Sequence, residues 1–236
     1  SIPSDILEIK SHSLAGFVLE SLIIEPRAEE LYFSSEYMNY STAINSIYVN
    51  SLEEWFMMKY EDLYNIVYAT DSVLYINNSP LENLDLLSNI DITEIRLPET
   101  IKYVAPTAFN YNVKMTTIKN MNGEDTCQIN DYLILDQGVL YTITENGKYV
   151  LNTYPTGKLE SEYEVIFGTV RIEEYAGYFN PNIKKIIFPD TLKLMGNKCF
   201  YGATKLNTVE FRSTVAPTFE GTITENDLNI KYDSNS

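Results

Sequence analysis

The 236-residue sequence predicts a right-handed solenoid of the α/β class, with a parallel ladder of short strands, short helical turns and inserted β-hairpins. Two observations predict this fold. A long sequence pattern occurs more than once, and each copy contains a short stretch in which inward-facing apolar residues alternate with outward-facing ones. One copy of such a pattern cannot bury its own apolar side chains, whereas stacked copies bury them against one another.

The clearest repeat pairs RLPETIKYVAPTAFNYNVKMTTI, which ends at Ile118, with FPDTLKLMGNKCFYGATKLNTV, which ends at Val209. The matching apolar residues that precede these stretches are Ile95 and Ile186. The separation from Ile95 to Ile118 equals the separation from Ile186 to Val209. A fixed period of this size is typical of leucine-rich solenoids. The repeat therefore predicts coils that stack on one another.

A third copy, VIFGTVRIEEYAGYFNPNIKKI, occupies residues 165–186. Its first and last residues are closer together by two positions, so it is shorter than the other two copies. The alignment places Phe179 opposite Phe109, and it places Gly168 where the first copy has Pro98. We expect this copy to form a coil between those of the other two.

Each part of the repeat has a structural role. In the segment IRL at residues 95–97, the outer residues point into the core and the middle one points out, as a strand requires. Pro98 ends the strand because proline has no N–H for the ladder. Ala108 and Phe109 predict a tight helical turn whose aromatic ring fills the coil. Strands are predicted near residues 22–24, 47–49, 95–97, 118–120, 165–167, 186–188 and 209–211.

Two further passages resemble β-hairpins that a known repeat family inserts between its coils. SVLYINNSPLENL covers residues 72–84, and QGVLYTITENGKYVLNTYPTGK covers residues 137–158. Asn146 and Gly147 in the second passage predict a two-residue turn, since both residues tolerate positive φ. Together with the repeat pattern, these passages resemble the BspA-like leucine-rich repeat family of bacterial and protozoan cell-surface proteins. The resemblance extends over nearly the whole chain.

The repeats and the resemblance together predict how the chain is organised. Residues 1–21 carry no repeat, so we expect them to cap the apolar end of the stack. A single solenoid domain is predicted for residues 22–236, and it begins with a degenerate copy of the repeat. Hairpin insertions are expected at about 72–90 and 133–158, and a closing repeat at 209–232.

The charge balance excludes several classes of partner. The chain has 33 acidic and 17 basic residues, which give a net charge of −16. Such a surface repels phosphate groups, so neither nucleic acid nor an anionic membrane is expected as a partner. No apolar run approaches the roughly 20 residues that span a bilayer, so we expect no membrane insertion by this chain. The opening segment SIPSDILEIK lacks the apolar stretch of a signal peptide.

The residues that usually perform catalysis are scarce, and no catalytic, metal or cofactor site is predicted. His12 is the single histidine, and no nucleophile motif accompanies it. Cys127 and Cys199 lack the spacing of zinc ligands, and we expect them to remain free thiols. The acidic pairs at 29–30, 53–54 and 173–174 do not follow the order of a calcium loop, so solvated surface is their favoured interpretation.

The resemblance implies an extracellular, non-catalytic binding or adhesion module that recognises a protein on a host or bacterial surface, with a glycan as the second option. The outward side of the strand ladder is the expected binding face. The alternatives are a structural spacer and, with less support, a carbohydrate-active enzyme. β-Propensity alone also explains isoleucine and tyrosine on this face. The expected row consists of Ile23, Tyr48, Arg96, Lys119, Ile166, Ile187 and Glu210.

Overall fold

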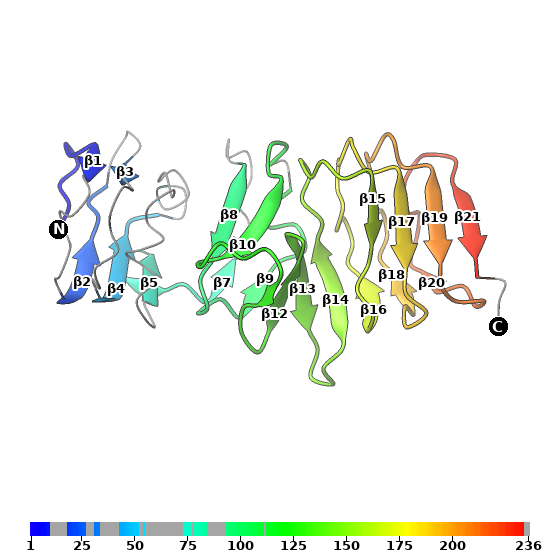
Figure 1. Cartoon of the computed structure of the whole chain (residues 1–236), viewed down its shortest axis with the longest axis horizontal. Coiled ribbons are helices and arrows are strands. Elements are labelled where there is room, and N and C mark those ends of the chain that lie inside the picture. The colour runs from blue at the N-terminus through cyan, green and yellow to red at the C-terminus, as the bar shows by residue number, and fades with distance from the viewer. Residues whose placement is uncertain are drawn as a thin grey trace. The chain divides into compact units, whose positions relative to one another are not determined.

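The computed structural model describes residues 1–9, 18–26, 31–33, 43–51, 54, 73–76, 78–84, 93–110 and 112–233. The chain forms two compact units, and strands make up nearly all the regular structure described in both (Figure 1). The first unit contains Ser1–Asn83, Arg96–Ile101 and Asn120–Glu124. The second contains Leu84–Ile95, Lys102–Lys119 and Asp125–Ser236. His12, the acidic pair at 29–30 and Glu53 lie outside the described residues.

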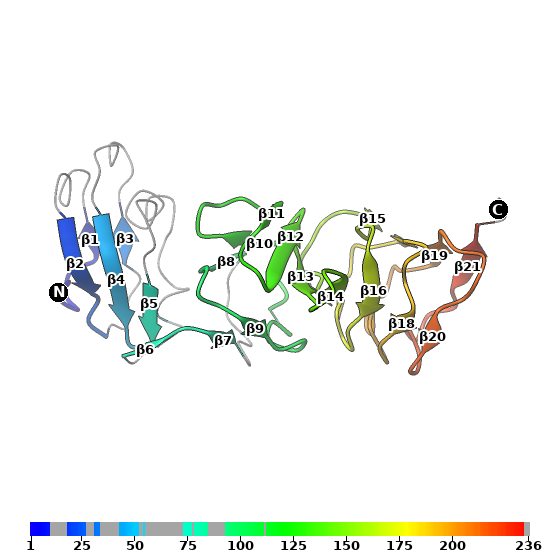
Figure 2. The same cartoon turned by 90° about the horizontal axis from the view of Figure 1, so that it is seen from below.

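The second unit contains two ladders of parallel strands. One ladder consists of β15 (Glu162–Glu164), β17 (Lys185–Phe188), β19 (Thr208–Phe211) and β21 (Asn229–Tyr232). The other continues from β14 (Tyr149–Thr153) through β16 (Thr169–Ile172), β18 (Leu194–Met195) and β20 (Thr218–Phe219). The chain visits the two ladders alternately, and they form two opposing walls of the solenoid (Figure 2). The predicted parallel ladder is confirmed.

The strand register corrects the alignment of the third sequence copy. Tyr163 pairs with Ile186, which pairs with Val209, and these two offsets along the chain are equal. The strand predicted at 165–167 lies instead at β15, and Ile166 follows it outside any strand. Gly168 accordingly lies beside Thr191, whose hydroxyl accepts a hydrogen bond from the Gly168 N–H at 3.1 Å. The third copy is therefore a full coil rather than a shortened one.

The coil interior alternates large and small residues. Phe200 is 1% exposed, and its ring lies 6.3 Å from that of Tyr154 in an edge-on arrangement. The register makes Gly177 the counterpart of Phe200 one coil earlier, and a Cβ atom there would overlap the Phe200 ring. Phe179, which the sequence alignment placed in this interior position, is 45% exposed. That placement was wrong because the alignment carried the two-residue error of the third copy.

A buried asparagine closes the turn of this coil. The side-chain amide of Asn180 donates to the carbonyl oxygens of Pro155 at 2.9 Å and Lys158 at 3.0 Å. Its oxygen accepts from the N–H groups of Asn182 and Ile183. Because buried polar groups must be paired, these four bonds determine the turn conformation without a helix. Asn226 makes similar amide bonds in a later coil.

Antiparallel hairpins interrupt the parallel ladders, although their turns differ from prediction. β11 (Cys127–Gln128), β12 (Leu133–Asp136), β13 (Val139–Ile143) and β14 pair antiparallel in order. The two-residue turn with positive φ at both positions is Gln137–Gly138. At the Asn146–Gly147 site only the glycine has positive φ, and its N–H donates to the Thr144 carbonyl. That geometry is typical of a three-residue loop.

The first unit contains a shorter parallel ladder of β2 (Val18–Ile23), β4 (Ala43–Val49) and β5 (Val73–Ile76), continued antiparallel by β6 (Ser79–Pro80). β1 (Glu8–Ile9) pairs parallel with β3 (Tyr32–Phe33). Leu22 and Ile47 are buried and paired, as the expected strands require. The other described strands are β7 (Asn83–Leu84), β8 (Glu94–Leu97), β9 (Tyr103–Val104) and β10 (Thr117–Asn120).

The structure does not confirm the α/β label or the helical turns. Apart from helical backbone at Glu54, the regular elements in the described part of the chain are strands. The segments after β9 and β18 bury Phe109 and Phe200 as expected, but they do so through hydrogen-bonded turns. No helix in the described ranges is long and apolar enough to cross a membrane. Neither a single domain over 22–236 nor a cap over 1–21 is tested by these observations.

Candidate binding surfaces

The outward row of the first unit combines apolar and aromatic side chains. Strand register places Ile23 beside Tyr48, and Tyr48 beside Tyr75. Ile23 is 46% exposed, and both tyrosines are half-buried. The two tyrosine rings stack with centroids 4.6 Å apart and an interplanar angle of 16°. We call Ile23, Tyr48 and Tyr75 the aromatic row. Tyr75 was not among the predicted site residues.

The outward row of the second unit differs from the predicted one. Ile187 is only 4% exposed, and its register neighbours are Glu164 and Glu210. Arg212 lies 3.5 Å from Glu164 and 3.0 Å from Glu210, so it links the two glutamates that flank Ile187. Ile166 is half-buried outside the strands and packs against the core. The predicted patch of exposed isoleucines is therefore absent from this ladder.

Charged side chains on the same ladder form a connected set of ion pairs. Lys185 lies 3.2 Å from Glu162 and 3.1 Å from Glu210. Hydrogen bonds that this partly exposed lysine donates to the Glu210 and Glu162 carboxylates raise its pKa. Because these charges already have partners within the ladder, few unpaired charges remain among its described outward side chains.

The two basic residues of the predicted row are also engaged. Lys119 forms an ion pair with Glu94 at 2.7 Å. Arg96 is 7% exposed, so its side chain does not project freely from the strand. These residues therefore do not present the accessible basic pair that was expected to meet a partner.

A buried polar network lies behind the hairpin insertion. The hydroxyl groups of Tyr141 and Tyr163 are 2.7 Å apart, and Tyr163 donates to the Asp136 carboxylate at 2.8 Å. Burial raises the pKa of Tyr141, and burial is also the main cause of the raised pKa of Tyr163. These hydroxyls therefore remain protonated, and they act as structural donors that link β12, β13 and β15.

This network predicts a stability loss at alkaline pH. The unfolded chain ionises these tyrosines near pH 10, whereas the folded chain keeps them neutral. The contribution of the two tyrosines to the free energy of unfolding is thus fully present below pH 10. It falls as pH rises above 10, by up to about 1.4 kcal/mol per pH unit for each tyrosine. Urea unfolding between pH 8 and 11 measures the slope. The Tyr141→Phe variant should have a shallower slope, and an unchanged slope would contradict this role.

The two cysteines are not joined in a disulfide, and their environments differ. Cys199 is fully buried, and burial raises its pKa to about 12, whereas Cys127 is partly exposed. Because the thiolate is the reactive form, Cys199 should resist modification. We expect a thiol reagent to modify Cys127 alone in the native protein and both cysteines in denaturant. Rapid native modification of Cys199 would contradict its place in the coil interior.

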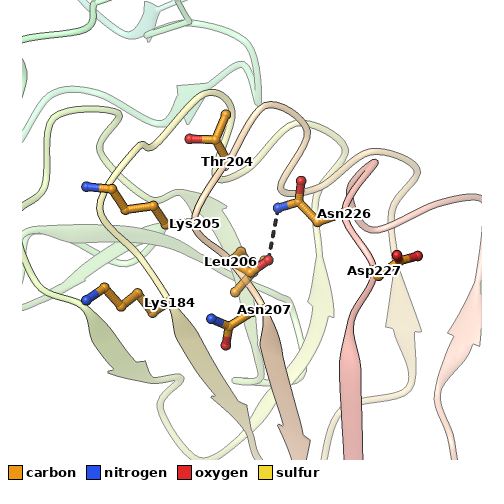
Figure 3. Close-up of a pocket in the computed structure, with 7 residues that line it drawn as sticks. All are labelled: Lys184, Thr204, Lys205, Leu206, Asn207, Asn226 and Asp227. Carbon is orange, nitrogen blue, oxygen red and sulfur yellow. Dashed lines mark hydrogen bonds between the residues drawn. The ribbon is translucent and has the colours of Figure 1, made fainter.

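An open groove of about 510 Å³ lies beside the turns of the last coils. Figure 3 shows the Lys184 and Lys205 side chains extending to the same side, with Asp227 at the opposite end. The amide of Asn226 is already used, because it donates to the Leu206 carbonyl at 2.9 Å. The Lys184 and Lys205 ammonium groups could receive a carboxylate at this groove.

Among the described residues, no group of three or more His, Cys, Asp or Glu side chains is placed to hold a metal ion. Glu173, from the acidic pair at 173–174, lies 3.2 Å from Arg171 in an ion pair. Its neighbour Glu174 is exposed, which fits the interpretation as solvated surface.

Coils of two short strands and a turn, stacked in parallel register, define a leucine-rich repeat solenoid. The chain belongs to the BspA-type leucine-rich repeat family, whose model matches residues 1–116, 72–144 and 168–231 in six copies. No curated protein matches the chain.

Three solved structures are similar to the chain at low identity. The first is a leucine-rich cell-surface protein from Faecalibacterium prausnitzii (15% identity, TM-score 0.46); the match covers 64% of that protein, which is less than two thirds, and 82% of this chain. The second is the pneumococcal vaccine antigen PcpA (15%, TM-score 0.40), with 68% of its chain and 99% of this one covered. The third is a leucine-rich repeat protein from Eubacterium ventriosum (12%, TM-score 0.44), with 61% and 83% covered.

Proposed function

We propose that this chain is a non-catalytic binding module of the cell surface that recognises a protein partner through the aromatic row. The observation that carries the proposal is the exposure of Ile23 beside the stacked rings of Tyr48 and Tyr75. Tyrosine provides a large contact area at low entropy cost, and it is enriched where proteins bind one another.

The contrast between the ladder of the first unit and the β15–β21 ladder of the second unit supports this choice of face. In the second unit, ion pairs of Arg212 and Lys185 occupy the outward side chains. In the first unit, the neighbours of the aromatic row include the small hydroxyl residues Ser21 and Ser46, whose register pairing places them side by side. Small neighbours leave the rings accessible to a partner. Membership of the family supports placement at the cell surface.

The test compares two variants that each carry three substitutions to serine. Immobilised protein is presented with extracellular proteins of host tissue and of bacterial surfaces, and the captured proteins are quantified. We expect Ile23→Ser/Tyr48→Ser/Tyr75→Ser to lower capture of a specific partner at least tenfold. The matched control, Glu164→Ser/Glu210→Ser/Arg212→Ser, should retain it. Equal loss in both variants, or loss only in the control, would contradict the site.

Two other functions predict different results, one in this capture assay and one in an assay of turnover. A structural spacer captures no specific protein in either form. An enzyme would turn over a glycan or peptide substrate and would lose that turnover on a single aspartate or glutamate change. We expect specific capture by the unmodified chain and no turnover of either class of substrate.

A further inference from the structure

A second pocket lies entirely within the second unit, away from the aromatic row in sequence. It has a volume of about 250 Å³. Its lining comes from β9 and its flanking residues, from β13 and β14, from the residue after β16 and from the loop before β12. The residues that carry the argument below are Lys102, Tyr103, Tyr132, Thr142, Asn152 and Glu173.

Two exposed aromatic rings line this pocket. Tyr103 and Tyr132 are each 48% exposed. The hairpin insertion places Tyr132 there, because the N–H of Ile143 donates to the Tyr132 carbonyl at 2.7 Å. The Asn130 side chain also accepts from the Tyr132 N–H at 2.8 Å. These two hydrogen bonds hold the backbone that carries this ring.

The polar groups of the pocket are also held in place. Asn152 is 2% exposed, and its amide donates to the Val104 carbonyl at 2.8 Å, which ties β14 to the strand that carries Tyr103. The Glu173 carboxylate is positioned by Arg171. The Thr142 hydroxyl and the Lys102 side chain add further hydrogen-bonding groups to the lining. These groups include donors and acceptors, whereas an apolar ligand would need neither.

We propose that this pocket binds a neutral saccharide. A sugar ring has apolar C–H faces and an edge of hydroxyl groups. Two tyrosine rings suit the faces, and the carboxylate, hydroxyl and ammonium groups of the lining suit the edge. The volume is slightly below that of pockets for drug-sized ligands, so it suits one ring of a longer chain. A neutral sugar is specified because the lining holds one basic and one acidic side chain, Lys102 and Glu173, so it favours neither sign of charge.

The experiment titrates the protein with maltose, cellobiose, lactose and N,N′-diacetylchitobiose and measures saturation-transfer NMR signals. We expect at least one disaccharide to bind in the millimolar range. Tyr103→Ala and Tyr132→Ala should each weaken binding at least fivefold, whereas Tyr103→Phe and Tyr132→Phe retain it because the ring remains. Tyr232→Ala, at another exposed tyrosine, is the matched control and should bind normally.

Three results would overturn the proposal, and none of them depends on the aromatic row. It is overturned if none of the four disaccharides binds, or if binding survives both alanine variants. It is also overturned if a short tyrosine-rich peptide binds the pocket while the disaccharides do not. Folding is checked by thermal unfolding of each variant, and both tyrosines are exposed enough for the alanine variants to fold.

Discussion

The Phe200→Ala variant is expected to lose about 3–5 kcal/mol of the free energy of unfolding of the second unit. The Phe200 ring is buried among Tyr154, Phe188 and the backbone of Gly177. Its removal leaves a cavity in the core between the two ladders, because the surrounding structure relaxes only partially. Urea unfolding followed by circular dichroism measures the change, which is a large part of the stability of a typical domain.

Phe179→Ala is the matched control for this prediction. Phe179 has the same side chain and lies in the preceding turn, but it is 45% exposed and contacts surface rings such as Tyr178 and Tyr201. We expect its replacement to cost less than about 1.5 kcal/mol, the value of an aromatic pair. Similar losses for the two variants would contradict the assignment of Phe200 to the interior.

Gly177→Ala is expected to destabilise the same unit by about 1–3 kcal/mol through overpacking. A Cβ at this position would overlap the Phe200 ring, which is held on its other sides by the core. Unfolding in urea measures the loss. If the clash with the ring is the cause, shortening the ring should relieve it.

The double variant Gly177→Ala/Phe200→Leu tests this cause. Its loss of stability should be smaller than the summed losses of the two single variants, by about 0.5–3 kcal/mol, since the residues are in contact. Strict additivity would show that Gly177 is needed for another reason. It would then count against the alternation of large and small residues in the coil interior.

Much of the fold could be predicted from the sequence because most positions of the repeat carry a residue type that suits one structural role. Pro98 and Pro189 end their strands at β8 and β17, as predicted. The regular spacing of buried residues such as Ile186 and Val209 indicated the ladder register. Helical turns could not be distinguished from other turns, because an Ala-Phe pair is compatible with both. In the coil of Gly177, the side-chain bonds of the buried Asn180 determine a turn without a helix.

The third copy was misaligned because its residues are unusual at two positions. Tyr163 occupies a strand position where the other copies have an aliphatic residue, and Gly177 occupies the position of the interior phenylalanine. Alignment by residue type therefore assigned Val165 to the strand position of Tyr163, and Phe179 to the interior position of Gly177. A constant repeat length, imposed on all copies, would have found Tyr163 and placed Ile166 outside the strand.

The candidate site was predicted only in part, because exposure depends on neighbours in space. Ile23 and Ile187 both occupy outward strand positions, yet Arg212 links the glutamates beside Ile187 and nothing comparable accompanies Ile23 among the described residues. The pairing of Tyr48 with Tyr75 depends on a long connection between β4 and β5. No spacing rule in the sequence identifies that partner, although the VLYI strand pattern at 73–76 was visible.

The most direct test of the proposed function is photo-cross-linking at the aromatic row. A benzophenone amino acid replaces Tyr48 in one protein and Glu210 in another, and each is irradiated with a partner captured by the unmodified chain. We predict a covalent complex from position 48, with the contact mapped by mass spectrometry, and none from position 210. A cross-link from position 210 alone would contradict the account, because it would place the partner on the ion-paired ladder.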